Sequence, residues 1–109
     1  MQTTCIRIKL KKDSMVDVRN WFQTLNLRMN ETIETLKKEG VTVESVFLDK
    51  YGDDDFLIYY MKAKDLNHAR EVFKNSTDPI DQYHKECTRN LCGDRVVLEE
   101  LLNIDLIPQ

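Results

Sequence analysis

Four side chains in this sequence have the chemistry to hold or transform a small polar ligand: Arg7, Glu44, Tyr59 and His84. Arg7 lies in a segment of alternating polar and apolar residues, and we expect it to share one face of a sheet with Glu44 and Tyr59. On that face Glu44 could act as a general base and Tyr59 as a general acid, if burial shifts their pKa values. An Arg7–Glu44 ion pair that orders the structure and catalyses nothing explains the same residues. The pattern leaves both interpretations open.

His84 is the better candidate of the two histidines, because it lies between Ile80 and Cys87 on the apolar side of a predicted helix. Asp81, three residues earlier, is placed to hold one nitrogen of the ring. Such a ring can act as a base or bind a metal, but a half-buried structural histidine gives the same pattern. His68 falls on the polar side of its own helix and is expected to be solvated.

Motifs for metals and cofactors are lacking. Cys92 turns away from the helix face that His84 and Cys87 share, which is unlike the compact spacing of a zinc site. The aspartates at 53–55 lack the ligand spacing of a calcium loop. There is no glycine-rich phosphate loop and no Ser-His-Asp signature. We therefore expect no metal and no cofactor, and whether the protein is an enzyme stays open.

The composition is that of one ordinary globular domain over residues 1–109, with 41% hydrophobic residues. The 16 Lys+Arg and 19 Asp+Glu are interspersed and give a net charge of -3, so nucleic acid is not an expected partner. The first residues lack the apolar run of a signal peptide, and no stretch of about 18 apolar residues offers a membrane span. We expect a cytoplasmic protein whose three cysteines are reduced thiols.

Two elements are predicted before residue 41. Residues 5–11 alternate in polarity, which predicts a strand with its isoleucines facing the helices. A helix begins after the capping residues Asp13 and Ser14 and ends at Gly40, and its length allows a kink near Asn26. Its apolar positions recur at steps of three and four: Met15, Val18, Phe22, Leu25, Met29, Ile33 and Leu36.

A hairpin follows, with strands at 41–50 and 56–62 and a turn centred on Gly52 and Asp53. Pairing across this turn places two sets of residues on opposite faces. One set is Val43, Ser45, Phe47, Phe56, Ile58 and Tyr60, and the other is Glu44, Val46, Leu48, Leu57, Tyr59 and Met61. Both faces are therefore largely apolar.

The rest of the chain completes a β-α-β-β-α-β order. Asp65 caps a helix that ends at Asn75, a second helical segment restarts at Asp78 and Pro79, and residues 96–102 form a last strand. This order predicts an α+β ferredoxin-like sandwich, a four-stranded antiparallel sheet with helices on one face. The other apolar face needs a cover, so we expect a homodimer formed through the sheet. The residues expected in that interface are Val46, Leu48, Leu57 and Met61.

Three segments carry a resemblance to a known family: ESVFLD at 44–49, LIYYMKA at 57–63 and DPIDQYH at 78–84. They resemble a bacterial family of unknown function within the dimeric α/β-barrel superfamily. The resemblance covers nearly the whole chain and implies a pocket between the helices, the sheet and the facing subunit. Superfamily members include cofactor-free monooxygenases, haem-degrading enzymes, sugar mutarotases and ligand-binding modules, so the fold selects no chemistry. Haem ligation by His84 rests on this analogy alone.

The expected function is a homodimeric binding or interaction module with a small-molecule ligand in that pocket. The alternative is a cofactor-free enzyme of the mutarotase or monooxygenase type, acting by acid/base chemistry through Glu44, Tyr59 and His84. The third interpretation is a purely structural dimer, in which side chains fill the barrel and leave no cavity.

Overall fold

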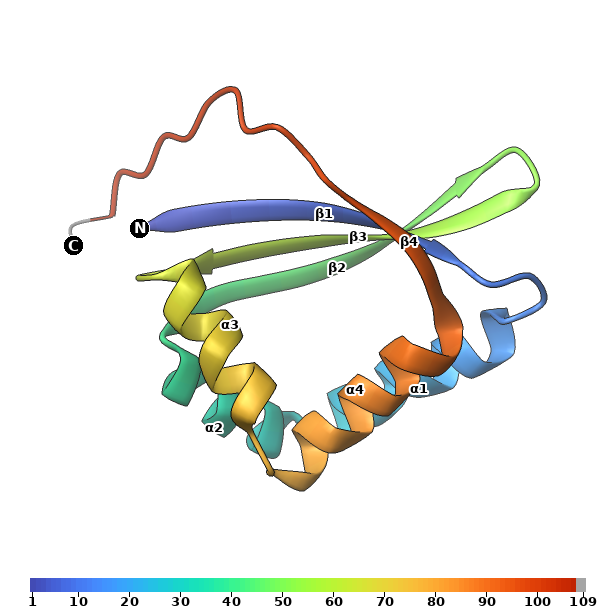
Figure 1. Ribbon diagram of the computed structural model, residues 1–109, viewed down its shortest axis with the longest axis horizontal. Coiled ribbons are helices and arrows are strands. Elements are labelled where there is room, and N and C mark those ends of the chain that lie inside the picture. The colour runs from blue at the N-terminus through green and yellow to red at the C-terminus, as the bar shows by residue number, and fades with distance from the viewer. Residues whose placement is uncertain (108–109) are drawn as a thin grey trace.

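The chain folds in the predicted β-α-β-β-α-β order, with both helical elements divided in two (Figure 1). The computed structural model describes residues 1–107. In chain order the elements are β1 (Gln2–Leu10), α1 (Met15–Leu27), α2 (Met29–Glu39), β2 (Val41–Tyr51), β3 (Asp54–Ala63), α3 (Leu66–Asn75), α4 (Pro79–Leu91) and β4 (Cys92–Val97).

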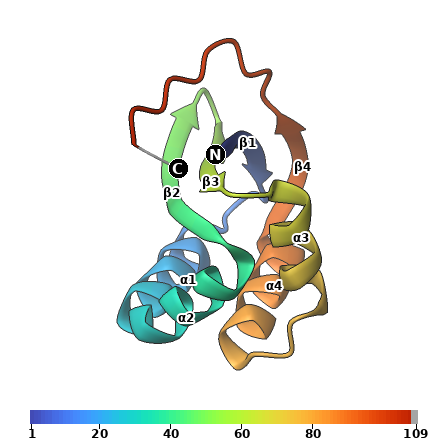
Figure 2. The same ribbon diagram turned by 90° about the vertical axis from the view of Figure 1, so that its left-hand side faces the viewer.

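The four strands form one antiparallel sheet in the order β2-β3-β1-β4. All the helices cover one face of it, and the segment that follows β4 arches over the other face (Figures 1 and 2). This arrangement confirms the predicted ferredoxin-like α+β fold. We call the face without helices the open face.

The hairpin register is the predicted one. Gly52 adopts a positive φ of 63° at the turn, which a residue without a Cβ tolerates best. From this turn the pairing runs through Leu48 with Leu57 and Val46 with Tyr59 to Glu44 with Met61. Turn position and alternation are both local properties, so the sequence was sufficient to predict which hairpin residues share a face.

Which of the two faces meets the helices was predicted wrongly. Ile6 pairs with Tyr59, whereas Arg7 pairs with Ile58. Tyr59 and Glu44 therefore lie on the helix side together with Ile6, and Arg7 lies on the open face. The four residues predicted to form the dimer interface, Val46, Leu48, Leu57 and Met61, are also on the helix side. The error arose because both hairpin faces are apolar, and alternation cannot say which one the helices cover.

The first helical element ends and restarts at Arg28, two residues beyond the predicted kink. Arg28 has φ and ψ of -105° and 36°, and its side chain forms an ion pair with Glu31 at 2.7 Å. After the break, Met29 and Ile33 of the apolar stripe are 44% and 41% exposed, whereas Leu36 still packs against the core. Thr35 and Glu39 are the buried residues of α2 instead.

The second helical pair follows the prediction. Asp65 Oδ1 accepts a hydrogen bond from the backbone N–H of His68 at 3.1 Å, which caps α3. Pro79 begins α4 as its first helical residue. No helix within residues 1–107 is long and apolar enough to cross a bilayer.

The last strand lies earlier than predicted. β4 begins at Cys92, directly after α4, and not at residue 96. Cys92 pairs with Leu10 next to a β-bulge, and Val97 pairs with Ile6. After the backbone N–H of Leu98 bonds to the carbonyl of Cys5 at 2.9 Å, the chain leaves the sheet. The part of the predicted strand at 98–102 lies on the outgoing segment instead, and its leucines are exposed.

Trp21 and Leu57 form the centre of the core, at 1% and 2% exposure. They pack with Ile8, Leu10 and Val18 between the sheet and the α1–α4 pair. Each such side chain contributes about 1.5–3 kcal/mol through burial. The central position of Trp21 bears directly on the site described next.

Candidate functional site

His84 lies at the centre of the polar groups enclosed between the helices and the sheet. The indole N–H of Trp21 donates a hydrogen bond to His84 Nδ1 at 3.1 Å. On the other side of the ring, Tyr59 Oη lies 3.4 Å from His84 Nε2. Two of the predicted candidates thus meet, from β3 and α4. Asp81 was predicted to hold the ring, but the ring nitrogens face Trp21 and Tyr59.

These contacts determine where the imidazole proton is. Burial lowers the pKa of His84 to about 4, so the ring is neutral near pH 7. An indole N–H can only donate, so Nδ1 of His84 carries no proton and the ring proton is on Nε2. His84 Nε2–H then donates to Tyr59 Oη. The proton of the Tyr59 hydroxyl is left to point elsewhere, toward a ligand or a carboxylate.

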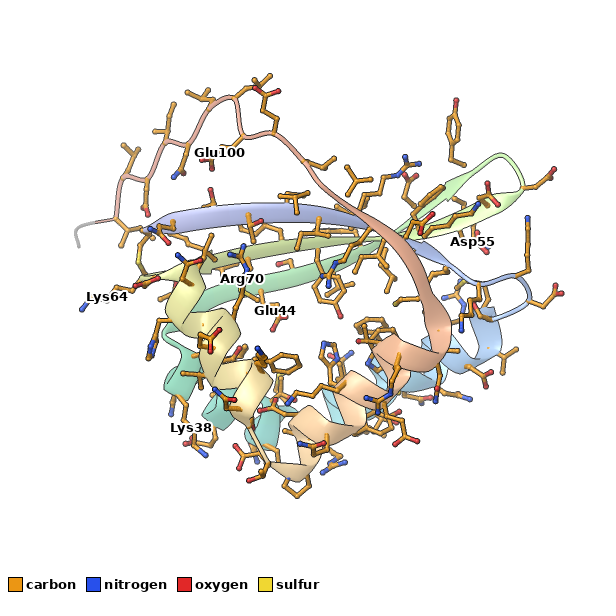
Figure 3. All side chains as sticks on the ribbon, viewed as in Figure 1. Lys38, Glu44, Asp55, Lys64, Arg70 and Glu100 are labelled. Atoms are coloured by element: carbon orange, nitrogen blue, oxygen red, sulfur yellow. The ribbon has the colours of Figure 1, made fainter. Side chains whose placement is uncertain are left out.

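Three carboxyl groups on the helix side of the sheet influence one another's pKa values. Glu39 ends α2, Glu44 projects from β2 toward the helices (Figure 3), and Asp81 lies in the first turn of α4. Burial, then Asp81, then Glu44 raise the pKa of Glu39 to about 8. Burial and Asp81 also raise the pKa of Glu44. Near pH 7, therefore, not all three carboxyl groups are ionised.

Burial and the neighbouring Glu44 carboxyl hold the pKa of Tyr59 well above its ordinary value. The phenol is therefore a hydrogen-bond donor at physiological pH, never a phenolate. Glu44 and Tyr59 were predicted to act near each other, and the structure brings them together on the helix side of the sheet.

Aromatic rings surround the Tyr59–His84 contact. Phe73 of α3 meets the His84 ring edge-on at 5.7 Å between centroids, and Trp21 lies at 5.2 Å. Phe22 stacks on Trp21 at 4.4 Å and reaches Tyr59 at 6.4 Å. The polar atoms are therefore held in mostly apolar surroundings, where electrostatic interactions are stronger than in water.

An open groove of about 390 Å³ lies between α1 and the sheet. Its lining residues are Met15, Val18, Arg19, Phe22, Gln23, Asn26, Val46, Phe47, Leu48 and Leu57. Phe22 and Val46 also neighbour Tyr59, the first by ring contact and the second by strand pairing.

Arg7 does not belong to the site, contrary to the prediction. Its guanidinium stacks over the Phe56 ring at 3.6 Å and lies 3.8 Å from an oxygen of Asp49, both on the open face. The predicted Arg7–Glu44 ion pair therefore does not form, because a single step of strand alternation separates the two faces.

Sequence reasoning missed Glu39 and Trp21 as site residues. Both positions carried a signal. Glu39 comes three residues after Leu36, the last residue of the apolar stripe. The spacing therefore places a carboxyl group on the apolar face of the helix. Trp21 lies three residues after Val18 and four before Leu25, a core spacing of its own.

Metal ligation does not fit these residues. Within residues 1–107 no group of three His, Cys, Asp or Glu side chains could hold a metal ion. Ligation through His84 Nε2 would require the proton on Nδ1, which faces the Trp21 N–H donor. The same conflict argues against His84 as a haem ligand.

The fold and these interior groups define an α+β protein of the ferredoxin-like class. The chain belongs to DUF6176, a family of unknown function whose sequence profile matches residues 1–108. No curated protein matches the chain in sequence.

Several solved structures share the fold, among them the following two. One is a de novo designed protein with a ferredoxin fold, 16% identical, with a TM-score of 0.58 over 100% of this chain and 96% of that one. The other is a putative antibiotic biosynthesis monooxygenase from Nitrosomonas europaea, 13% identical, with a TM-score of 0.57 over 94% of this chain and 100% of that one. At these identities the likeness extends to the fold alone.

Proposed function

We propose that the chain is a single-domain, homodimeric binding module for a small molecule. Its ligand contacts the hydroxyl of Tyr59 and the carboxyl of Glu44 between the helices and the sheet. The observation that carries this proposal is the Trp21–His84–Tyr59 chain of contacts, which orients a buried phenol proton away from the imidazole. A donor fixed in apolar surroundings beside a carboxyl is a typical element of a small-molecule site.

Binding is favoured over acid/base catalysis by the state of His84. A general base needs a nitrogen lone pair that faces the substrate. In His84 one lone pair accepts from Trp21, and the other nitrogen carries the ring proton. The histidine therefore positions the Tyr59 hydroxyl and is not available as the base.

The alternative is a cofactor-free enzyme of the mutarotase or monooxygenase type. The raised pKa of Glu44 beside the neutral Tyr59 phenol favours it, because such a pair can exchange a proton with a substrate. The shared fold with a putative monooxygenase agrees with this alternative without selecting it.

Homodimerisation is proposed through the open face. Phe47 and Val96 on this face are 61% and 56% exposed, and Ile58 lies between their strands. An exposed apolar sheet face is usually covered by another surface, and a second copy covers it symmetrically.

A thermal-shift screen with sugars, carboxylic acids, amines and aromatic compounds tests the ligand proposal. We expect at least one class to raise Tm, and Tyr59→Phe to remove that effect. Tyr60→Phe is the matched control, because Tyr60 is the next residue of β3 and faces the open side. No stabilisation by any class, or equal effects of the two variants, would contradict the proposal. Turnover of a stabilising compound would favour the enzyme alternative.

A further inference from the structure

β2 forms one edge of the sheet, and its outer side has no neighbouring strand (Figure 2). Alternate residues of such an edge strand direct their N–H and C=O groups away from the sheet. Within residues 1–107, no group outside the β2–β3 pair forms a hydrogen bond with residues 45–48. Phe47 and Leu48 are 61% and 38% exposed, so this stretch is accessible. It therefore offers unpaired backbone donors and acceptors to a second extended chain.

The middle of β2 lacks the features that usually protect an exposed strand edge. Proteins block such edges with charged side chains, prolines or bulges. The register of β2 shifts between Val41 and Val43, and the nearest charged residues are Glu44 and Asp49, one at each end of the stretch. Residues 45–48, with the sequence SVFL, are uncharged and regularly paired with β3. Nothing in these four residues opposes the addition of another strand.

The open groove described above runs beside the same stretch. Residues 46–48 line it from the sheet, and α1 forms the opposite wall. Figure 2 shows α1 beneath the β2 edge of the sheet, whereas α4 lies beneath the β4 edge. Met15, Arg19 and Gln23, which line the groove, are spaced four residues apart and so share one side of α1. When a peptide adds to a sheet edge, its backbone bonds to the strand and its alternate side chains enter pockets beside the strand.

Arg19 gives the groove its charge. Among the residues within 1–107 that line the groove, Arg19 is the only charged one, and the others are apolar or carry neutral amides. Its guanidinium forms no ion pair or hydrogen bond with any described residue. A free guanidinium beside an apolar groove is complementary to a carboxylate carried by an otherwise apolar segment.

We propose that the edge of β2 at residues 45–48 and the groove beside α1 bind an extended, acidic and apolar peptide segment of a partner protein. The peptide pairs with β2 as an added strand, places alternate apolar side chains in the groove and brings a carboxylate to Arg19. This surface is separate from the interior ligand proposed near Tyr59, because Tyr59 is not among the residues that line the groove.

Phage-displayed random 12-residue peptides, selected against the full chain, supply the probe. We expect the selected sequences to share alternating apolar residues and an acidic residue. The tightest peptide is synthesised, and its affinity is measured by fluorescence anisotropy. Two further versions of it are N-methylated, each at one alternate set of backbone positions. Only one set faces β2 in a paired strand, so one version should lose at least tenfold in affinity and the other should lose little.

Substitutions in the chain test the two walls separately. Arg19→Gln should weaken binding about fivefold, the effect of one partly solvated ion pair, and Arg89→Gln, at an exposed position of α4, is its matched control. Leu48→Glu should weaken binding at least tenfold, by placing a charge in the groove that repels the acidic peptide. Val43→Glu is the matched control, because Val43 is 39% exposed on the same strand but outside the groove. Tyr59→Phe should leave the affinity for the peptide unchanged.

Three results would overturn the inference: no enriched sequence, equal binding of the two N-methylated versions, or unchanged affinity in Arg19→Gln. Arg19→Gln changes an exposed side chain, so it keeps the test valid if Leu48→Glu does not fold. A second copy of the chain is the other occupant that an open strand edge can take. In that case no peptide is enriched, and Leu48→Glu shifts a dimer toward monomer in sedimentation velocity, which would also overturn the inference.

Discussion

At the residue scale, the Trp21 indole controls the imidazole of His84, which in turn holds the Tyr59 hydroxyl. Trp21→Phe removes the N–H donor while keeping an aromatic ring in the core. We expect a loss of about 1–3 kcal/mol in unfolding free energy, from the lost hydrogen bond and the smaller ring. We also expect His84 to lose its fixed tautomer, which ¹⁵N NMR of the imidazole would report. A ring that keeps its proton on Nε2 in this variant would contradict the assigned role of Trp21.

Glu39 and His84 make opposite contributions to the pH dependence of stability. The folded protein binds more protons than the unfolded chain at Glu39, whose pKa rises from 4.5 to about 8, so stability falls as pH rises through that interval. At His84 the pKa falls from 6.5 to about 4, so stability rises with pH over that interval. The two effects offset each other below pH 6.5, and the carboxyl effect remains above it.

We therefore expect the unfolding free energy to fall by up to about 2 kcal/mol between pH 6.5 and 8. The raised pKa of Glu44 acts in the same direction. Urea unfolding at a series of pH values measures this, and Glu39→Gln should flatten the profile while Glu71→Gln should not. A profile that is already flat in the unmodified chain would show that Glu39 titrates normally.

Of the candidate site residues, Glu44, Tyr59 and His84 were predicted from the sequence. Each lies in an element whose type and apolar face can be predicted from the residues around it. It could not predict that Tyr59 and His84 touch, since they belong to β3 and α4 and only the packed fold joins them. Arg7 was misplaced for a related reason. The alternation of β1 is clear, but its register against β3 depends on a long-range pairing.

At the element scale, Gly40 joins α2 to β2 with a left-handed backbone, at φ 74°. A Cβ at this position would meet nothing within 4 Å, so the cost of a side chain comes from the backbone conformation alone. We expect Gly40→Ala to destabilise the fold by about 1 kcal/mol, measured by chemical denaturation. Gly40→Asn should cost less, because asparagine tolerates this conformation. Equal losses for the two variants would contradict this explanation.

Elements with local start and stop signals were predictable, and those defined by tertiary contacts were not. Asp65 and the Asp78–Pro79 pair mark the beginnings of α3 and α4 correctly. The break at Arg28 has no proline or glycine to signal it, and β4 begins without a turn directly after α4. The apolar residues after Val97 predicted a strand because exposure cannot be read from composition.

At the scale of the whole molecule, helices cover one face of the sheet, and the segment that follows β4 passes over the open face (Figure 2). Ile58 lies on the open face, opposite Arg7 on one side and Phe47 on the other. We expect Ile58→Asp to shift a dimer toward monomer, by placing a charge in the interface. Leu27→Asp is the matched control, because Leu27 is 81% exposed at the end of α1 on the helix side. Sedimentation velocity over a concentration series distinguishes the outcomes.

The segment at 98–107 adds a second apolar surface above the open face. Polar contacts hold it to the sheet: Thr3 Oγ1 donates to Glu100, and Lys62 Nζ pairs with Asp105 at 2.7 Å with both side chains only 13–14% exposed. A hollow of about 550 Å³ remains between this segment and the open face, lined in part by Cys5 and Tyr60. Leu101 and Leu102 border this hollow and are still largely exposed.

Three leucines of this segment are largely exposed: Leu101 at 87%, Leu102 at 77% and Leu106 at 89%. Exposed apolar side chains of this size do not stabilise a single subunit. We expect their joint replacement by serine to raise the dimer dissociation constant at least tenfold, because each apolar side chain buried by a partner contributes about 1.5–3 kcal/mol before association costs. The unfolding free energy of the separated monomer should stay within about 0.5 kcal/mol, since these side chains contribute little to its core. A monomer destabilised by several kcal/mol, with dimerisation unchanged, would instead assign the leucines to the fold of a single subunit.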